Sequence, residues 1–125
     1  MWIRVNPNPL GRNKPDCVIR ALCVALKRSW YDIYDDLCAL GREEATWGND
    51  DHVWGRYLYE MGFEPFLLPS HCPRCITIRN FTHLYPEGTY IIGTGSHAVA
   101  VIDGNYYDSW DSGDEVPSFF WVIRR

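Results

Sequence analysis

The sequence predicts an α+β domain, with helices in the first half of the chain and a sheet in the second. Apolar residues recur at three- and four-residue spacing between residues 17 and 61, as they do on one face of a helix. Short β-rich runs follow from residue 63 onward. Two of these runs are separated by Asp103-Gly104, a dipeptide typical of two-residue hairpin turns. Helices followed by an antiparallel sheet are typical of the α+β class.

Three helices are expected in the first half of the chain. Each follows a short polar side chain that can accept a hydrogen bond from the first turn, namely Asp16, Ser29, and Asp50 or Asp51. The first helix is expected over residues 17–27, because Val18, Ala21, Leu22 and Ala25 lie on one face. Glycines are expected to end the other two, at Gly41 and Gly62.

The expected strands lie in the second half of the chain. They are residues 63–68, a short run at 75–78, residues 89–93, the two arms of the hairpin around Asp103-Gly104, and residues 116–123. One helical turn is expected over residues 80–85. Pro117 stands near the start of the last run, as an edge strand tolerates.

Composition limits the classes of function. The 125 residues form one expected domain, 1–125, with enough apolar residues (46%) to build a core. A net charge of −4 without a basic cluster argues against a nucleic-acid partner. No apolar run is long enough to span a membrane, and the first residues lack a signal-peptide core, so we expect a cytoplasmic protein that does not bind membranes. No cofactor is predicted.

The hairpin brings a histidine and an acid together. A two-residue turn at Asp103-Gly104 pairs Val99 with Asp108 and His97 with Trp110. Because side chains alternate along a strand, His97 and Asp108 are expected to be diagonal neighbours on one face. A histidine oriented by a carboxylate is two-thirds of a nucleophilic triad.

Cys17 is the candidate nucleophile. It stands in the first turn of the first helix, where unpaired N–H groups and the helix dipole stabilise a thiolate. The alternative is a small buried apolar residue, which most free cysteines are. Cys23 and Cys38 fall on helical faces beside apolar residues and are expected in the core. Five cysteines leave at least one thiol without a partner in the chain.

A cysteine at the start of an early helix, then a histidine at the start of a strand, then an acid on the next strand, resembles the papain-like cysteine peptidases. Asp108-Ser109-Trp110 is similar to the Asn-Ser-Trp signature of papains, with Asp in place of Asn. The separation of Cys17 from His97 is shorter than in papain and nearer to that of the compact C39-like branch. The stretches 6–9, 16–22 and 107–115 resemble small C39-like proteins encoded by tailed phages and gut bacteria.

This resemblance implies a papain-like fold and a cysteine peptidase or related thiol acyl hydrolase with Cys17, His97 and Asp108 as its triad. It implies a peptide or protein substrate, and a host cytoplasm if the gene is carried by a phage. Trp110 would shield the histidine–acid hydrogen bond. The chain departs from the family around the nucleophile, since Pro15-Asp16-Cys17-Val18 replaces the usual Cys-Gly-Ser-Cys-Trp.

The family's oxyanion donor is also missing, because no glutamine precedes Cys17. Asn8 and Asn13 are the candidate replacements, together with the backbone N–H of Cys17, because the site needs N–H groups aimed at the developing charge. Turn formation is the alternative role for both asparagines.

Two other functions stay open. The chain could be an inactive papain-fold binding protein, such as a phage factor that engages a host protein or a small ligand. The absent glutamine and two aromatic residues expected to be exposed, Trp47 and Trp54, favour this. His71-Cys72-Pro73-Arg74-Cys75 could supply half of a zinc site, completed by His83 or His52. A pair of reduced thiols is favoured there over zinc, with a disulfide or redox role behind both.

Overall fold

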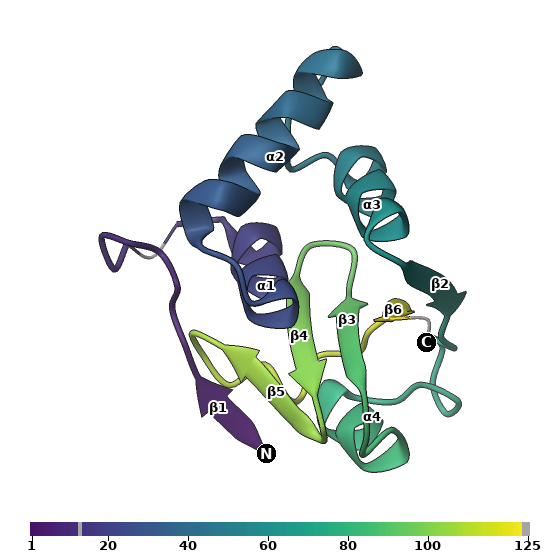
Figure 1. Ribbon diagram of the computed structural model, residues 1–125. Helices are drawn as coiled ribbons and strands as arrows, with labels where there is room; N and C mark the ends of the chain where they lie inside the picture. The colour runs from purple at the N-terminus through teal and green to yellow at the C-terminus, as the bar shows by residue number, and fades with distance from the viewer. Residues whose placement is uncertain (13, 124–125) are drawn as a thin grey trace.

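The computed structural model describes residues 1–12 and 14–123 and has an α+β architecture of four helices and a six-stranded sheet. The helices are α1 (Cys17–Leu26), α2 (Trp30–Glu43), α3 (Asp51–Glu60) and α4 (Ile78–Leu84). The strands are β1 (Trp2–Arg4), β2 (Phe63–Leu67), β3 (Thr89–Gly93), β4 (Ala98–Ile102), β5 (Asn105–Asp108) and β6 (Phe119–Ile123). Figure 1 shows the first three helices on one side of the strands.

The sheet is mixed. Its strand order is β1-β5-β4-β3-β6-β2, and all neighbours are antiparallel except β1 and β5, which run parallel. The predicted antiparallel sheet is therefore wrong at this one edge. The strand β1 is not among the expected strands, because its partner lies about a hundred residues away and no local signal indicates the pairing. The prediction that the last strand is an edge is also wrong, because β6 lies between β3 and β2 and Pro117 precedes it.

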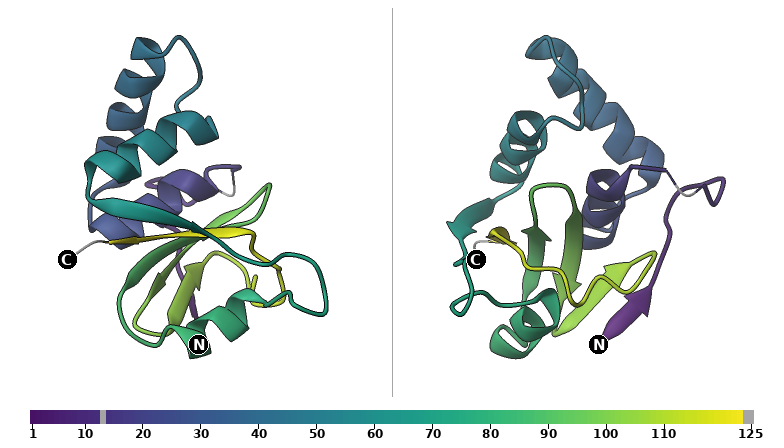
Figure 2. Two further views of the ribbon diagram at one scale, coloured as in Figure 1. Left: turned by 90° about the vertical axis from the view of Figure 1, so that its right-hand side faces the viewer. Right: turned by 180° about the vertical axis from the view of Figure 1, so that it is seen from behind.

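The two faces of the sheet bury separate cores. Residues of α1, α2 and α3, including Leu22, Ile33 and Leu58, pack against Ala98 and Ala100 of β4. On the other face, α4 packs against the alternate residues of the same strand, Val99 and Val101, together with Tyr106 and Phe120. Figure 2 shows α4 on the side of the sheet opposite the other helices. Alternating burial along β4 thus fixes which side of the sheet meets α1.

Local sequence explains most helix boundaries. The Ser29 hydroxyl accepts from the Asp32 N–H at 3.1 Å and begins α2, as predicted. Asp50 caps α3 by accepting from the His52 N–H at 2.9 Å. The predicted strand at 75–78 is wrong, because Thr77 and Asn80 form a reciprocal capping box that begins α4 at Ile78.

Gly41 does not end α2 as predicted. The helix continues to Glu43, and Gly41 is buried within it. An added Cβ at Gly41 would lie 2.7 Å from the Thr46 carbonyl oxygen and 3.0 Å from the Gly48 nitrogen. Glycine is needed here because the following loop folds back against the helix, which places residues 46–48 beside α2.

Candidate active site

Cys17 occupies the first position of α1, at the edge of a pocket. The residue before it, Asp16, holds the N-cap position but makes no side-chain capping bond, contrary to prediction. The N–H groups of a first helical turn have no partner within the helix and carry the positive end of its dipole. The Cys17 sulfur therefore lies where backbone groups favour a negative charge.

The hairpin register is as predicted over its paired residues. Ile102 pairs with Asn105, and Ala100 pairs with Tyr107, across a turn in which Asp103 and Gly104 have φ values of 49° and 81°. His97 directly precedes β4, and Asp108 ends β5.

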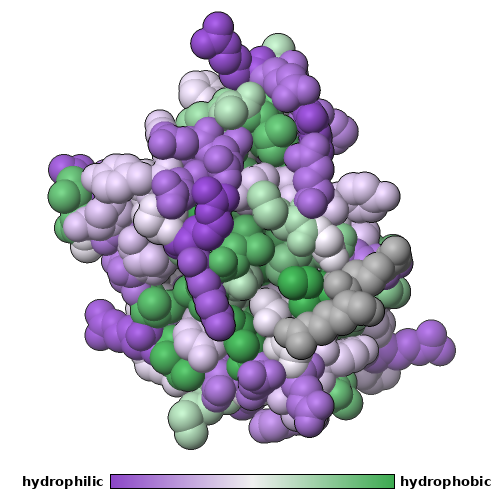
Figure 3. Space-filling view, in the orientation of Figure 1, coloured by the Kyte–Doolittle hydropathy of each residue, from purple (hydrophilic) through white to green (hydrophobic). Residues whose placement is uncertain are grey.

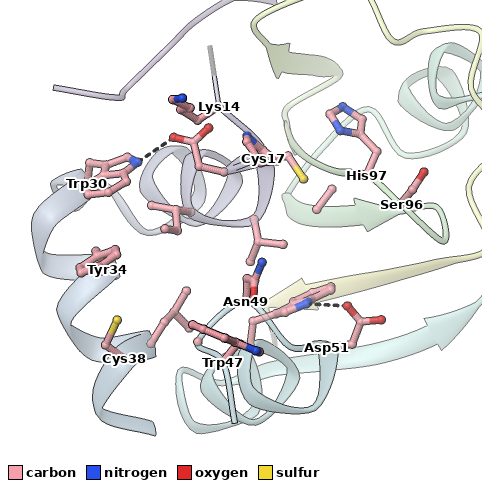
Figure 4. Close-up of a pocket in the computed structure, with 18 of the residues that line it drawn as sticks. Lys14, Cys17, Trp30, Tyr34, Cys38, Trp47, Asn49, Asp51, Ser96 and His97 are labelled. Carbon is pink, nitrogen blue, oxygen red and sulfur yellow. Dashed lines mark hydrogen bonds between the residues drawn. The ribbon is translucent and has the colours of Figure 1, made fainter. Parts of the chain in front are cut away.

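The predicted meeting of the three side chains is confirmed. Nε2 of His97 lies 2.5 Å from Oδ2 of Asp108. His97 also interacts with the neighbouring Cys17 thiol, and Nδ1 is the ring nitrogen that Asp108 leaves available for this interaction. Figure 4 shows the Cys17 sulfur and the His97 ring on the same wall of the pocket. Their catalytic role stays a prediction.

The environment of Cys17 favours the thiolate. Burial by itself raises the pKa of the thiol and is the largest single effect, but the interactions with His97, with the Ala98 N–H and with the charge of Arg20 together outweigh it. The net result is a pKa below the ordinary value of 9.0 for cysteine. Cys23 shows the contrast, since burial and the charge of Asp16 raise its pKa to about 11.

The environment of His97 favours the imidazolium. Burial lowers its pKa, but hydrogen bonds and charges of Asp108 and Cys17 raise it more, from 6.5 to about 9. At neutral pH the ring is therefore charged while the neighbouring sulfur is predisposed to ionise. Both shifts act in the direction of a thiolate–imidazolium pair.

Asp108 is held in place by several donors. Its carboxylate is nearly buried and accepts from the Ser112 hydroxyl at 2.6 Å and from the Ser109 N–H at 2.8 Å, besides His97. Ser112 is itself only 1% exposed. Because every donor points at the charged form, this carboxylate is fixed as an acceptor for the imidazole. The role of Ser112 was missed in the sequence, where it reads as part of an acidic turn.

Trp110 contacts the histidine, as the hairpin register predicts. The two ring centroids are 5.2 Å apart with an interplanar angle of 36°. Trp110 remains 46% exposed, whereas the His97 side chain is 11% exposed. The indole thus covers one side of the imidazole while its own outer face stays in solvent.

The Asp16 carboxylate binds other side chains instead of the backbone N–H groups of the helix it precedes. Its carboxylate forms an ion pair with Arg20 at 3.3 Å and accepts from the Trp30 indole N–H at 2.9 Å. Arg20 is buried at 8% exposure and also donates to the Ser109 hydroxyl at 2.9 Å. This cation therefore joins α1 to the loop after β5. The Asp16–Arg20 spacing of one helical turn was the signal for it in the sequence.

The two predicted oxyanion residues fare differently. The Asn8 side chain folds into its own loop, where Nδ2 donates to Asp16 at 3.2 Å and Oδ1 accepts from the N–H groups of Leu10 and Arg12. Asn8 does not line the Cys17 pocket, so its geometry does not support an oxyanion role. Asn13 lies outside the described residues. Asn49, which the sequence did not single out, lines the pocket from the loop before α3.

The pocket beside Cys17 has a volume of about 570 Å³. Its walls come from the start of α1, from α2, from the loop and first turn of α3, and from the β3–β4 loop. Aromatic side chains are prominent among them: Trp30, Tyr34, Trp47 and Trp54. Figure 3 shows hydrophobic residues gathered in the middle of this side of the molecule, surrounded by hydrophilic ones.

Two predicted exposures are corrected. Trp54 is 3% exposed, not a surface aromatic, because its ring packs on Phe119 and its N–H bonds to Asp51; Trp47 is 82% exposed, as predicted. Cys38 is a free, exposed thiol lining the pocket instead of a core residue, whereas Cys23 is buried.

The Cys-x-x-Cys motif forms a disulfide between Cys72 and Cys75, which corrects the preference for reduced thiols. In the part of the chain that the structure describes, no group of three or more histidine, cysteine, aspartate or glutamate residues could hold a metal ion. Within the same residues, no helix is long and apolar enough to cross a membrane.

Comparison of the chain with protein-family models, with curated proteins and with solved structures gives no match.

Proposed function

We propose that this protein is a thiol acyl hydrolase of the papain-like, C39-like type, with Cys17 as nucleophile, His97 as general acid and base, and Asp108 as the residue that orients the histidine. The observation that carries the proposal is the position of His97, which hydrogen-bonds to Asp108 and interacts with the Cys17 thiol beside the pocket. Three such groups in contact beside an open pocket are the arrangement that nucleophilic catalysis requires.

The reaction proceeds in two halves. The Cys17 thiolate attacks the carbonyl carbon, and the carbonyl π electrons move to its oxygen. The backbone N–H of Cys17 donates to this oxyanion. When the intermediate collapses, the His97 imidazolium gives its proton to the leaving amine, and an acyl thioester remains. His97, now neutral, takes a proton from water, whose oxygen attacks the thioester and releases the acid and the thiolate.

Peptides or proteins are the proposed substrates. The pocket is large enough for side chains on either side of an amide, and its aromatic walls suit apolar groups. The covalent intermediate gives the test. Incubation with p-nitrophenyl acetate, followed by rapid acid quenching and intact mass measurement, should find one acetyl group on Cys17. The Cys17→Ala protein should carry none, and a wild-type protein without the adduct would contradict the proposal.

A binding protein that retains the site without turnover is the second candidate. The hydrogen bonds of the Asn8 side chain within its own loop favour this second candidate, because Asn8 is then not available to donate to an oxyanion. Losing one such donor costs about a hundredfold or more in rate. The acetyl adduct separates the two: a stable thioester that water does not release indicates binding or transfer, and repeated turnover indicates hydrolysis.

A further inference from the structure

A second pocket of about 400 Å³ lies next to the first, at the β2 edge of the sheet. It is on the helix-covered face, where Phe119 and Trp121 of β6 pack towards α3. Its lining is almost entirely apolar and consists of Trp54, Pro65, Phe66, Leu67, Phe119 and Trp121, with Asp51 as the one charged residue.

The two pockets share a wall. Asp51 and Trp54, in the first turn of α3, line both of them. The Trp54 indole N–H donates to Oδ1 of Asp51 at 3.0 Å, as Figure 4 shows, and the Trp54 ring lies 5.9 Å from the ring of Phe119. Because Trp54 is buried, this wall is fixed. The pocket beside Cys17 and the apolar pocket therefore adjoin each other at the start of α3.

The far rim of the second pocket is unusually exposed for its residue types. Leu67 is 89% exposed although it belongs to a paired strand, where it lies opposite Phe119 of the same pocket lining. Large apolar groups beside a cavity are removed from water when an apolar ligand group enters it. Asp51 adds a negative charge at the entrance, which repels an acidic group and accepts from an N–H or a cation.

We infer that the second pocket is a specificity subsite for a large apolar, preferably aromatic, side chain of a peptide whose reacting carbonyl lies at Cys17. This inference rests on the proposed acyl transfer, and it deepens that proposal by naming the substrate class. The subsite excludes acidic residues and accepts neutral or basic neighbours at its Asp51 entrance.

Peptidyl electrophiles test the inference. Tripeptidyl acyloxymethyl ketones are prepared with Gly, Phe, Lys or Asp at each position in turn, and alkylation of Cys17 is followed by mass spectrometry. Each rate is divided by the iodoacetamide rate of the same protein, which removes differences in thiol reactivity. At one position the Phe reagent should react about tenfold or more faster than the Gly reagent, since even one methylene in an apolar pocket has about that effect. The Asp reagent should be the slowest there.

A matched pair of variants locates the effect. Leu67→Asp places a charge on the rim, whereas Leu84→Asp makes the same change at a 61% exposed leucine on α4. The first should abolish most of the preference for Phe, and the second should retain it. Equal rates for Phe and Gly at every position, or equal behaviour of the two variants, would overturn the inference while leaving the proposed chemistry intact. A Cys17 that reacts with iodoacetamide no faster than Cys38 would overturn both.

Discussion

Replacing Asp108 by Asn should uncouple the site while keeping its shape. Oδ2 of Asp108 accepts from His97 and Ser112, and Oδ1 accepts from the Ser109 N–H. An Asn amide has one acceptor and one NH₂ group, so in either orientation an N–H faces a donor. A buried mismatch of this kind costs about 1–3 kcal/mol of stability.

The larger effect is on ionisation. The pKa of His97 is raised from 6.5 to about 9, which corresponds to about 3 kcal/mol in favour of the imidazolium. Asp108 and Cys17 share this effect, with the hydrogen bond to Asp108 the largest favourable contribution. Removing the carboxylate should therefore lower the pKa of His97 and reduce the thiolate population of Cys17 near neutral pH.

The assay is the rate of Cys17 carbamidomethylation by iodoacetamide across pH, read at the peptide level, with the exposed free thiol of Cys38 as an internal control. At neutral pH, Cys17 should react more slowly in the Asp108→Asn protein than in wild type, and the midpoint of its pH–rate profile should move to higher pH. An unchanged Cys17 profile in a folded Asp108→Asn protein would refute the argument that Asp108 sustains the ion pair.

Three further outcomes are expected. Because the pKa of His97 is higher in the folded protein than its ordinary value, the charged imidazole stabilises the fold fully below pH 6.5, and this contribution is lost as pH rises through about 9. The free energy of unfolding in urea should show this loss in wild type and not in His97→Asn. Ser112→Ala removes a buried hydrogen bond to Asp108, so it should lower the free energy of unfolding by about 1 kcal/mol and slow the alkylation of Cys17. An unaltered alkylation rate would limit Ser112 to a structural role. Gly41→Ala forces backbone segments apart and should lower the free energy of unfolding, measured by chemical denaturation, by about 1–2 kcal/mol. Its control, Gly95→Ala, adds a methyl group in open space and should cost about 0.5 kcal/mol or less. Equal effects of the two substitutions would contradict the steric explanation.

The part of the fold that sequence predicts well is the part set by local signals. The Ser29 cap, the strand at 89–93 and the Asp103-Gly104 hairpin all depend on residues within a few positions of each other, and all are confirmed. The hairpin also places His97 beside Asp108, because a turn of known type determines the register of both strands.

What sequence missed depends on distant contacts. Gly41 reads as a helix end, but its neighbours are the backbone atoms of residues 46–48 that fold against it. The direction of β1 depends on β5, and the burial of Trp54 depends on Phe119. The pocket itself could not be read from the chain, because its walls come from α1, α2, α3 and the β3–β4 loop together.

The ultraviolet absorbance of the thiolate tests the central claim most directly. Wild-type protein is titrated from acid to alkaline pH, and the same titration of Cys17→Ala is subtracted, so that only the ionisation of Cys17 remains. We predict that the thiolate forms below the ordinary cysteine pKa of 9.0 and that its formation moves to higher pH when His97 is replaced by Asn. A difference signal that first appears near pH 9, with or without His97, would contradict the activated sulfur on which the proposed chemistry depends.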